Sequence, residues 1–212
     1  MLPMRRFVLT VFFLTVFFLS SILSFASATQ AEVQIGASAP QFTASDVHGV
    51  NQSLDQYKGK IIVLEWTNPE CPYVVKHYQT GNMQQLQKKY VGLGVVWLTI
   101  NSSGENKQGN LSTEEAKNYL SEKAAVPTAY LFDPSGTIGK SYGAKTTPHM
   151  FIINSAGTVA YAGAIDDNSS SRHSSVENAR NFVAEALDAL LADQPVQTAS
   201  TKAYGCSVKY SS

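Results

Sequence analysis

IIVLEWTNPECPYVVKHY, residues 61–78, contains one of the two cysteines of the chain. Its first six residues are apolar or β-branched apart from Glu65, which is typical of a strand that is buried on both faces. The residues three, four and seven positions after Cys71 are apolar or aromatic and share its face of a helix. Pro72 favours the first helical position, because the N–H that proline lacks is not needed there. The stretch therefore predicts a central strand, a loop, and Cys71 at the start of a helix.

The rest of the chain continues this alternation of strands and helices. The expected strands cover 61–66, 94–100, 128–132, 149–154 and 158–163, and the expected helices begin at 72 and 113 and cover 176–191. The first helix should break at Gly81 and Asn82, and the last two strands should form a β-hairpin. This order predicts an α/β fold with a central mixed β-sheet flanked by helices. It is the layout of the thioredoxin fold, in which the loop after the first central strand carries the reactive sulfur.

The N-terminus has the pattern of a targeting segment. Arg5 and Arg6 precede the apolar run FVLTVFFLTVFFLSSILSF, and the small residues ASA follow at 26–28. This is the pattern of a signal peptide covering residues 1–28, and an uncleaved membrane anchor is the alternative. We expect a thioredoxin-like domain over 29–195 and a C-terminal tail over 196–212.

Export would place the mature protein in the periplasm or the medium, without stable membrane association after cleavage. In such an oxidising space two cysteines can persist as a disulfide. No basic stripe suggests a nucleic-acid partner. The two distant cysteines and four scattered histidines show no metal-ligand spacing, so we expect neither a metal nor another cofactor.

Cys71 should be chemically unusual because of its place at a helix start. Only the thiolate attacks disulfides or peroxides. The free N–H groups and the positive end of the helix dipole favour that anion, whereas the adjacent Glu70 opposes it. We therefore expect the Cys71 sulfur to be accessible and more acidic than a free thiol. The alternative is an inert cysteine, either in the core or in a structural disulfide.

Three further positions could belong to the same site. Thr147-Pro148 stands just before a strand, and a cis peptide there would present the Thr147 backbone to a ligand, although cis is the minority state of prolines in general. Glu65 is either an edge-facing solvated residue or a buried proton acceptor. Trp66 should pack beneath the site, as core filler or as a functional residue.

The segments APQF, KGKIIVLEW, CPYV and TTPHMFIIN together resemble the alkyl hydroperoxide reductase/thiol-specific antioxidant family, the redoxins of the thioredoxin superfamily. The similarity covers about residues 34–192. In particular, the chain resembles an exported peroxiredoxin-like branch with a lone Cys-Pro motif and a terminal GCSVKY. The resemblance implies a thioredoxin-like fold, a reactive Cys71, and a cis Pro148 opposite it.

The chain departs from the family pattern at several positions. Val74 occupies the place of the second cysteine in the thioredoxin Cys-x-x-Cys motif. Leu64 and Asn68 occupy the places of the proline and threonine that precede the peroxiredoxin cysteine. The arginines after the signal peptide, Arg172 and Arg180, do not lie in the strand that carries the peroxiredoxin arginine. The resemblance thus leaves disulfides and peroxides as alternative oxidants.

Cys206 is the remaining candidate for a partner of Cys71. A flexible tail could bring it to Cys71 as the resolving thiol. The alternatives are a structural disulfide, which would stabilise the fold by about 4–5 kcal/mol, and a bridge between two chains. Gly205, which permits an unusual backbone turn, and the aromatic residues Tyr204 and Tyr210 suggest that the tail docks.

Two functions follow from these observations. The first is an exported thiol oxidoreductase in which Cys71 attacks a disulfide or a peroxide and Cys206 resolves the intermediate. Its partners would be protein or small-molecule thiols and disulfides, with peroxide as a further substrate. The second is a non-catalytic secreted binding module, pinned by a structural Cys71–Cys206 disulfide.

Overall fold

A computed structural model describes residues 33–211 of the chain. The predicted signal peptide lies outside the described residues. Within residues 33–211 no helix is both long enough and apolar enough to cross a bilayer.

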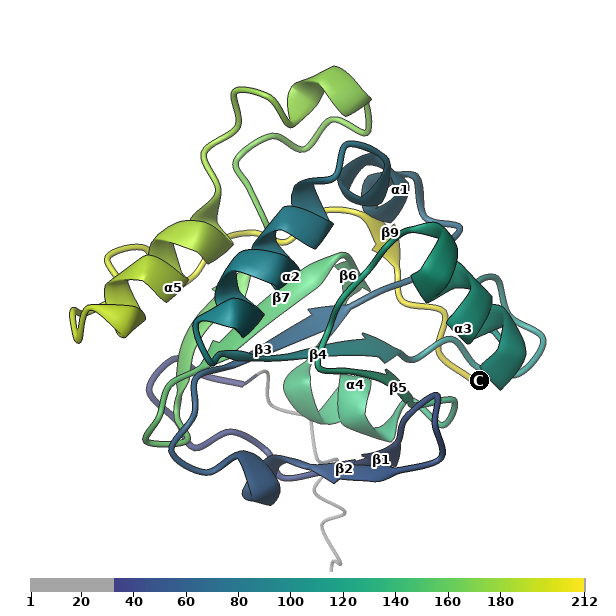
Figure 1. Cartoon of the computed structure of the whole chain (residues 1–212), viewed down its shortest axis with the longest axis horizontal. Helices are drawn as coiled ribbons and strands as arrows, with labels where there is room; N and C mark the ends of the chain where they lie inside the picture. Colours follow the sequence, from purple (N-terminus) through teal and green to yellow (C-terminus); the bar gives the residue numbers. More distant parts are fainter. Residues whose placement is uncertain (1–32, 212) are drawn as a thin grey trace, which may run out of the picture.

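A five-stranded sheet with the order β5-β4-β3-β7-β8 forms the centre of the domain (Figure 1). The strands are β3 (Ile62–Trp66), β4 (Val96–Asn101), β5 (Ala129–Phe132), β7 (His149–Ile153) and β8 (Val159–Gly163). β3 pairs parallel with β4 and antiparallel with β7, which confirms the predicted mixed sheet. Because β3 is the middle strand, the loop after Trp66 leaves the sheet at its centre, next to the start of β7 at His149.

Helices cover both faces of this sheet (Figure 1). They are α1 (Pro72–Gln79), α2 (Asn82–Gly92), α3 (Thr113–Glu122), α4 (Thr137–Tyr142) and α5 (Phe182–Leu191), with 3₁₀ turns η1 (Leu54–Tyr57) and η2 (His173–Ser175). α1, α2 and α5 share one buried cluster of side chains with the sheet. A second cluster on the opposite face includes Ile138 and Tyr142 of α4. A short hairpin, β1 (Thr43–Ser45) and β2 (Asn51–Ser53), also lies on the α4 side (Figure 1).

The structure differs from the predicted helices in two places. α5 begins at Phe182 instead of 176, because the Asn181 side chain caps it by accepting from the Ala184 amide at 2.9 Å. α4 was not predicted. It is six residues long and lies between Gly136 and Gly143, both with positive φ, so it is too short to show a helical period.

The tail, residues 196–211, is docked on the domain, as Tyr204, Gly205 and Tyr210 suggested, and Cys206 needs no flexible tail to lie against Cys71. Its strand β9 (Cys206–Ser207) pairs antiparallel with β6 (Thr146–Thr147), which directly precedes β7. In Figure 1 the tail is yellow and passes the start of α1. The Lys209 carbonyl accepts from the Gly104 amide at 2.8 Å. These contacts are backbone hydrogen bonds, which any residue can form, so they require no periodic apolar pattern in the tail.

Candidate active site

Cys71 is the N-cap residue of α1 and Pro72 is the first helical residue, as predicted. The sulfur, however, accepts no standard capping hydrogen bond. Its thiol instead donates to the backbone oxygen of Thr147 at 3.0 Å. The helix start therefore fixes where Cys71 lies, while the segment before β7 supplies a direct partner of its sulfur.

Thr147 connects the two cysteines. Its peptide bond to Pro148 is cis, which confirms the expectation from the family resemblance. Its carbonyl accepts from Cys71, and its backbone faces Cys206 in the β6–β9 pair. The Cys206 side chain in turn forms a hydrogen bond with Cys71, and both cysteines are free thiols. The structure thus brings together four of the residues predicted for the site: Cys71, Thr147, Pro148 and Cys206.

Gly205 permits this close approach of the tail. Its φ is +140°, a region that L side chains rarely adopt. A Cβ at this position would lie 2.1 Å from the Thr147 carbonyl oxygen, far inside contact distance. Only glycine fits between Tyr204 and Cys206 while β9 is paired with β6.

The two thiols have opposite pKa shifts. Burial raises the pKa of Cys71, but the hydrogen bond with Cys206 and the backbone amides of Cys206 and Val74 lower it, and the net result lies below the ordinary value. Burial, the hydrogen bond with Cys71 and the charge of Cys71 raise the pKa of Cys206 to about 11. Cys71 therefore ionises first, and Cys206 remains a thiol that donates to it. The Val74 amide at the helix start contributes less than Cys206, so the acidity depends more on the tail than the sequence suggested.

The Cys71 side chain is completely buried, with 0% of its surface exposed, whereas the sequence predicted an accessible sulfur. Part of what covers it is the tail, since Tyr204 and Cys206 pack on the buried cluster that contains Cys71. Cys206 itself is partly exposed. The cover is thus a short peripheral segment that also carries the second thiol. Because the Cys71 side chain has no exposed surface, a substrate reaches it only when β9 moves.

Glu65 is fully buried in the central strand, which excludes the edge-facing alternative. Its carboxylate accepts hydrogen bonds from four side chains: Tyr78 at 2.8 Å, Trp97 at 2.8 Å, Thr99 at 3.0 Å and Gln87 at 3.2 Å. Burial raises its pKa, and these donors oppose the rise only in part. Glu65 bonds to Tyr78 of α1 and Gln87 of α2, so its side chain lies on the same side of the sheet as Cys71. Its role as a proton acceptor remains a prediction.

Trp66 points to the other face of the sheet. It packs in the cluster that includes α4, with its ring 5.4 Å from that of Tyr142 and 5.2 Å from that of Phe151. Its Nε1 donates to Ser102 Oγ at 3.0 Å. Of the two alternatives, this position favours core filler.

The sequence reasoning missed a polar cluster beside the site. Lys76 and His77, on α1, are buried together with Asp166 and contact Tyr204 of the tail. Asp166 was expected to cap a turn, and it does accept from the Asn168 amide at 3.0 Å. Two adjacent polar residues at the end of an amphipathic helix are usually solvated, so the sequence signal for this cluster was weak.

The fold and the two adjacent thiols define the class of the protein: it has a thioredoxin-like fold with a pair of cysteines at the site. Residues 35–162 match the model of the AhpC/TSA family, which is more than half of the chain, so the chain belongs to this family. This confirms the resemblance inferred from the sequence.

Named relatives and solved structures agree with this classification. The thiol-disulfide oxidoreductase ResA of Bacillus thuringiensis subsp. konkukian is 29% identical over 132 residues, which cover 61% of this chain and 69% of ResA. An uncharacterized conserved protein from Geobacillus kaustophilus has a TM-score of 0.73 and 28% identity, over 84% of this chain and 93% of that one. The thioredoxin domain of a thiol-disulfide oxidoreductase from Bacteroides vulgatus has a TM-score of 0.50 and 17% identity, over 69% and 97%. The last similarity concerns the fold alone, and it confirms the thioredoxin-like prediction.

Proposed function

We propose that this protein is a thiol–disulfide oxidoreductase in which Cys71 and Cys206 are the exchanging pair. The observation that carries the proposal is the placement of Cys206 on Thr147, in hydrogen-bond contact with a Cys71 thiol whose pKa is lowered. The relatives named thiol-disulfide oxidoreductase support it.

The exchange proceeds in two steps. With the tail lifted, the Cys71 thiolate attacks one sulfur of a substrate disulfide, so that a Cys71–substrate disulfide forms and the other substrate sulfur leaves as a thiolate. When the tail docks again, Cys206 loses its proton to solvent and its thiolate attacks the Cys71 sulfur. The Cys71–Cys206 disulfide forms, and the second substrate thiolate leaves. The substrate gains two electrons and the protein dithiol loses two, so the reverse sequence oxidises a substrate dithiol.

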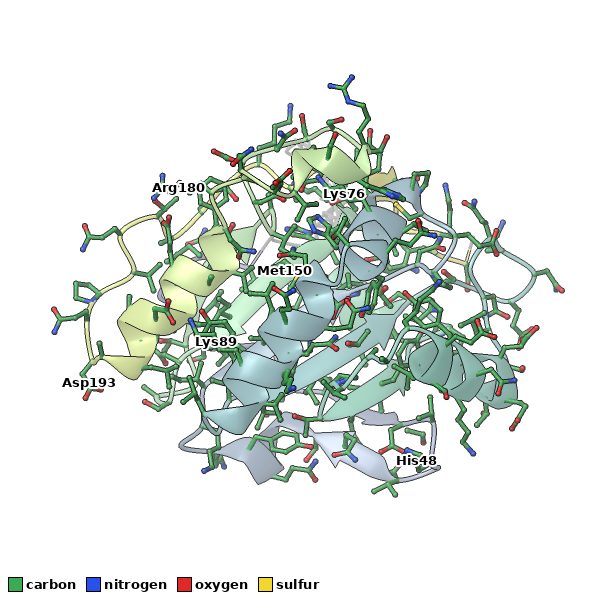
Figure 2. The ribbon with its side chains drawn as sticks, turned by 45° about the horizontal axis from the view of Figure 1, so that its top comes forward. His48, Lys76, Lys89, Met150, Arg180 and Asp193 are labelled. Carbon is green, nitrogen blue, oxygen red and sulfur yellow. The ribbon has the colours of Figure 1, made fainter. Side chains whose placement is uncertain are left out.

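The environment of Cys71 favours disulfides over peroxides. Asn68, at the position of the peroxiredoxin threonine, uses its side chain to hold the loop: it accepts from the Glu70 amide at 2.9 Å and donates to the Gln108 carbonyl at 3.2 Å. Arg180 is paired with Glu185 at 2.7 Å, on the surface (Figure 2). Arg172 is exposed as well. Neither arginine is placed to stabilise a peroxide oxygen at Cys71.

A hollow beside the tail offers a route for the substrate. It has a volume of about 610 Å³, and its walls include Tyr73, Thr146, Tyr204 and Gly205. Because these residues adjoin both cysteines, we propose that a thiol or disulfide of a protein or small molecule approaches there. We further propose that the chain acts after export, in the periplasm or outside the cell, as the N-terminal pattern of residues 1–28 predicts.

Disulfide reduction by the mature chain tests this function. With a peptide disulfide as substrate and dithiothreitol as reductant, we expect turnover by the wild type, none by Cys71→Ser, and a trapped Cys71–substrate disulfide in Cys206→Ser. Tandem mass spectrometry identifies the trapped cysteine. Hydrogen peroxide in place of the peptide tests the peroxidase alternative in the same assay.

Two results would contradict the proposal. One is wild-type turnover no faster than that of Cys71→Ser. The other is a Cys71–Cys206 disulfide that resists dithiothreitol in the folded protein, together with a large fall in melting temperature in Cys206→Ser. The second result would support the structural disulfide of a binding module.

A further inference from the structure

The tail inserts a tyrosine into a buried polar cluster next to the cysteines. The Tyr204 hydroxyl donates to Asp166 Oδ1 and lies 3.3 Å from His77 Nε2. Lys76 Nζ lies 4.9 Å from the centroid of the Tyr204 ring, and the Tyr73 ring lies 5.8 Å from it. Tyr204 thus contacts three ionisable side chains of the domain, two residues before Cys206.

The cluster holds charged groups in the interior. The side chains of Lys76 and His77 are 0% exposed, and that of Asp166 is 1% exposed. The Lys76 side chain extends from α1 to the segment that leads into η2 (Figure 2). There its Nζ donates to the Asn168 carbonyl at 2.7 Å and to the Ser170 carbonyl at 2.8 Å. Lys76 Nζ and Asp166 Oδ2 are 3.9 Å apart. Buried charges are costly unless they are paired and hydrogen-bonded, so this cluster needs its partners.

The Tyr204 hydroxyl links His77 and Asp166 by hydrogen bonds. The Asn82 side-chain nitrogen Nδ2 donates to His77 Nδ1 at 2.9 Å, which leaves Nε2 to carry the ring proton and donate to the Tyr204 hydroxyl. Burial, together with the charge of Lys76, lowers the pKa of His77 to about 3, so the ring is neutral at pH 7. Among residues 33–211, Asp166 Oδ2 has no hydrogen-bond partner. The Tyr204 hydroxyl is therefore the one side-chain donor that the described chain gives to the Asp166 carboxylate.

We propose that Lys76, His77 and Asp166 form a receptor for Tyr204, and that this contact positions Cys206 against Cys71. Tyr204 is a positioning residue, since it acts on the reacting sulfurs through the tail backbone. Gly205 joins it to Cys206 and lies against Thr147, so the inserted ring sets the register of β9 on β6. The inference rests on the proposed function, because it explains how the second thiol is held.

Removal of one hydroxyl tests the receptor. In the reduced mature chain, Tyr204→Phe should speed amide hydrogen exchange in residues 200–211 by about tenfold, because the loss of a hydrogen bond to a charged group weakens docking. Alkylation of the buried Cys71 by iodoacetamide should accelerate by about the same factor, since Cys71 reacts when the tail opens. Tyr130→Phe is the matched control: its buried hydroxyl accepts from the Asn101 side-chain amide at 3.0 Å, and the cluster in which Tyr130 packs contains no residue of the tail.

A double-mutant comparison separates positioning from general support of the fold. Tyr204→Phe should raise the pKa of Cys71 in the wild-type background, because the Cys206 hydrogen bond that lowers it is weakened. In a Cys206→Ala background the same change should leave the Cys71 pKa unaltered. A purely structural role would shift it equally in both backgrounds. The ultraviolet absorbance of the thiolate, followed against pH, measures each value.

Three results would overturn the proposal. They are tail exchange and Cys71 alkylation within about twofold of wild type in Tyr204→Phe, equal acceleration in Tyr130→Phe, and an equal pKa shift in both backgrounds. All readouts use reduced protein without a substrate. A failure of disulfide turnover would therefore refute the proposed function, whereas hydrogen exchange, alkylation and the Cys71 pKa decide this inference separately.

Discussion

Residues 61–78 and the tail, residues 196–211, each supply one cysteine, and they are built in different ways. In the first, strand composition, Pro72 and helical spacing all specify the observed structure locally. The tail has no such pattern and is held by contacts with segments distant in sequence, such as Thr147 and Asp166. The comparison teaches that local structure places Cys71, the proposed nucleophile, whereas the distant segment covers it and lowers its pKa.

The largest effect should come from a substitution at Gly205 that prevents the tail from docking on Thr147. Gly205→Ala introduces a Cβ that would lie 2.1 Å from the Thr147 carbonyl oxygen, at a φ of +140°. We expect β9 docking to weaken by more than about 2 kcal/mol. In a glutathione titration the Cys71–Cys206 pair should then shift toward the dithiol by more than about tenfold.

Gly157→Ala is the control for this substitution. Gly157 also has a positive φ, +81°, but no atom lies within 4 Å of a Cβ built there. It should lower stability by about 1 kcal/mol and leave the cysteine equilibrium unchanged. A Gly205→Ala variant with wild-type redox behaviour would show that close docking of the tail does not set the equilibrium.

An intermediate effect concerns the pH dependence of stability, through a residue of α1 that the tail helps to enclose. The pKa of His77 is about 3 in the folded protein, against an ordinary 6.5. Between these values the unfolded chain binds a proton that the folded chain does not, so this contribution to stability is complete above pH 6.5 and is lost as the pH falls toward 3. The slope from this one group is up to about 1.4 kcal/mol per pH unit.

Urea unfolding at several pH values in this window measures that slope. His77→Gln should flatten it, since glutamine keeps a hydrogen-bonding side chain and does not titrate. His48→Gln, at an exposed histidine, should leave it unchanged. The variant comparison cancels most of the contribution of the buried carboxylates Asp166 and Glu65, which are present in both proteins. Parallel slopes for wild type and His77→Gln would mean that His77 titrates freely in the folded state.

The smallest effect should come from Thr147→Val. The Thr147 hydroxyl is buried and has no hydrogen-bond partner in the described part of the chain, so its removal should change the free energy of unfolding by less than about 1 kcal/mol. The backbone that pairs with Cys206 and accepts from Cys71 remains. Because the Cys71 sulfur bonds to the Thr147 backbone oxygen at 3.0 Å and not to this hydroxyl, the pKa of Cys71 should stay at its wild-type value, as thiolate absorbance against pH would show. A raised pKa would show that the hydroxyl donates to the thiolate.

Much of the fold was predictable because periodicity encodes it. The five strands, the break at Gly81 and the helix that begins at Thr113 followed from composition and spacing. α4 was missed because it is too short to show a period, and the start of α5 was misplaced because the Asn181 cap is a local contact. At the site, Cys71 and Pro148 were found from their motifs. The receptor residues Lys76, His77 and Asp166 were not, since they are buried by contacts between segments far apart in the sequence.

The sequence by itself determined that a cysteine begins a helix after the middle strand of a mixed sheet, and which family the chain belongs to. Proline geometry and apolar spacing act between neighbours, so they can be read without coordinates. Only the tertiary structure decided that Cys206 lies against Cys71 and that Cys71 is covered. Those facts depend on a backbone edge at Thr147 and on the space left by Gly205, where segments far apart in the chain meet without any repeating pattern.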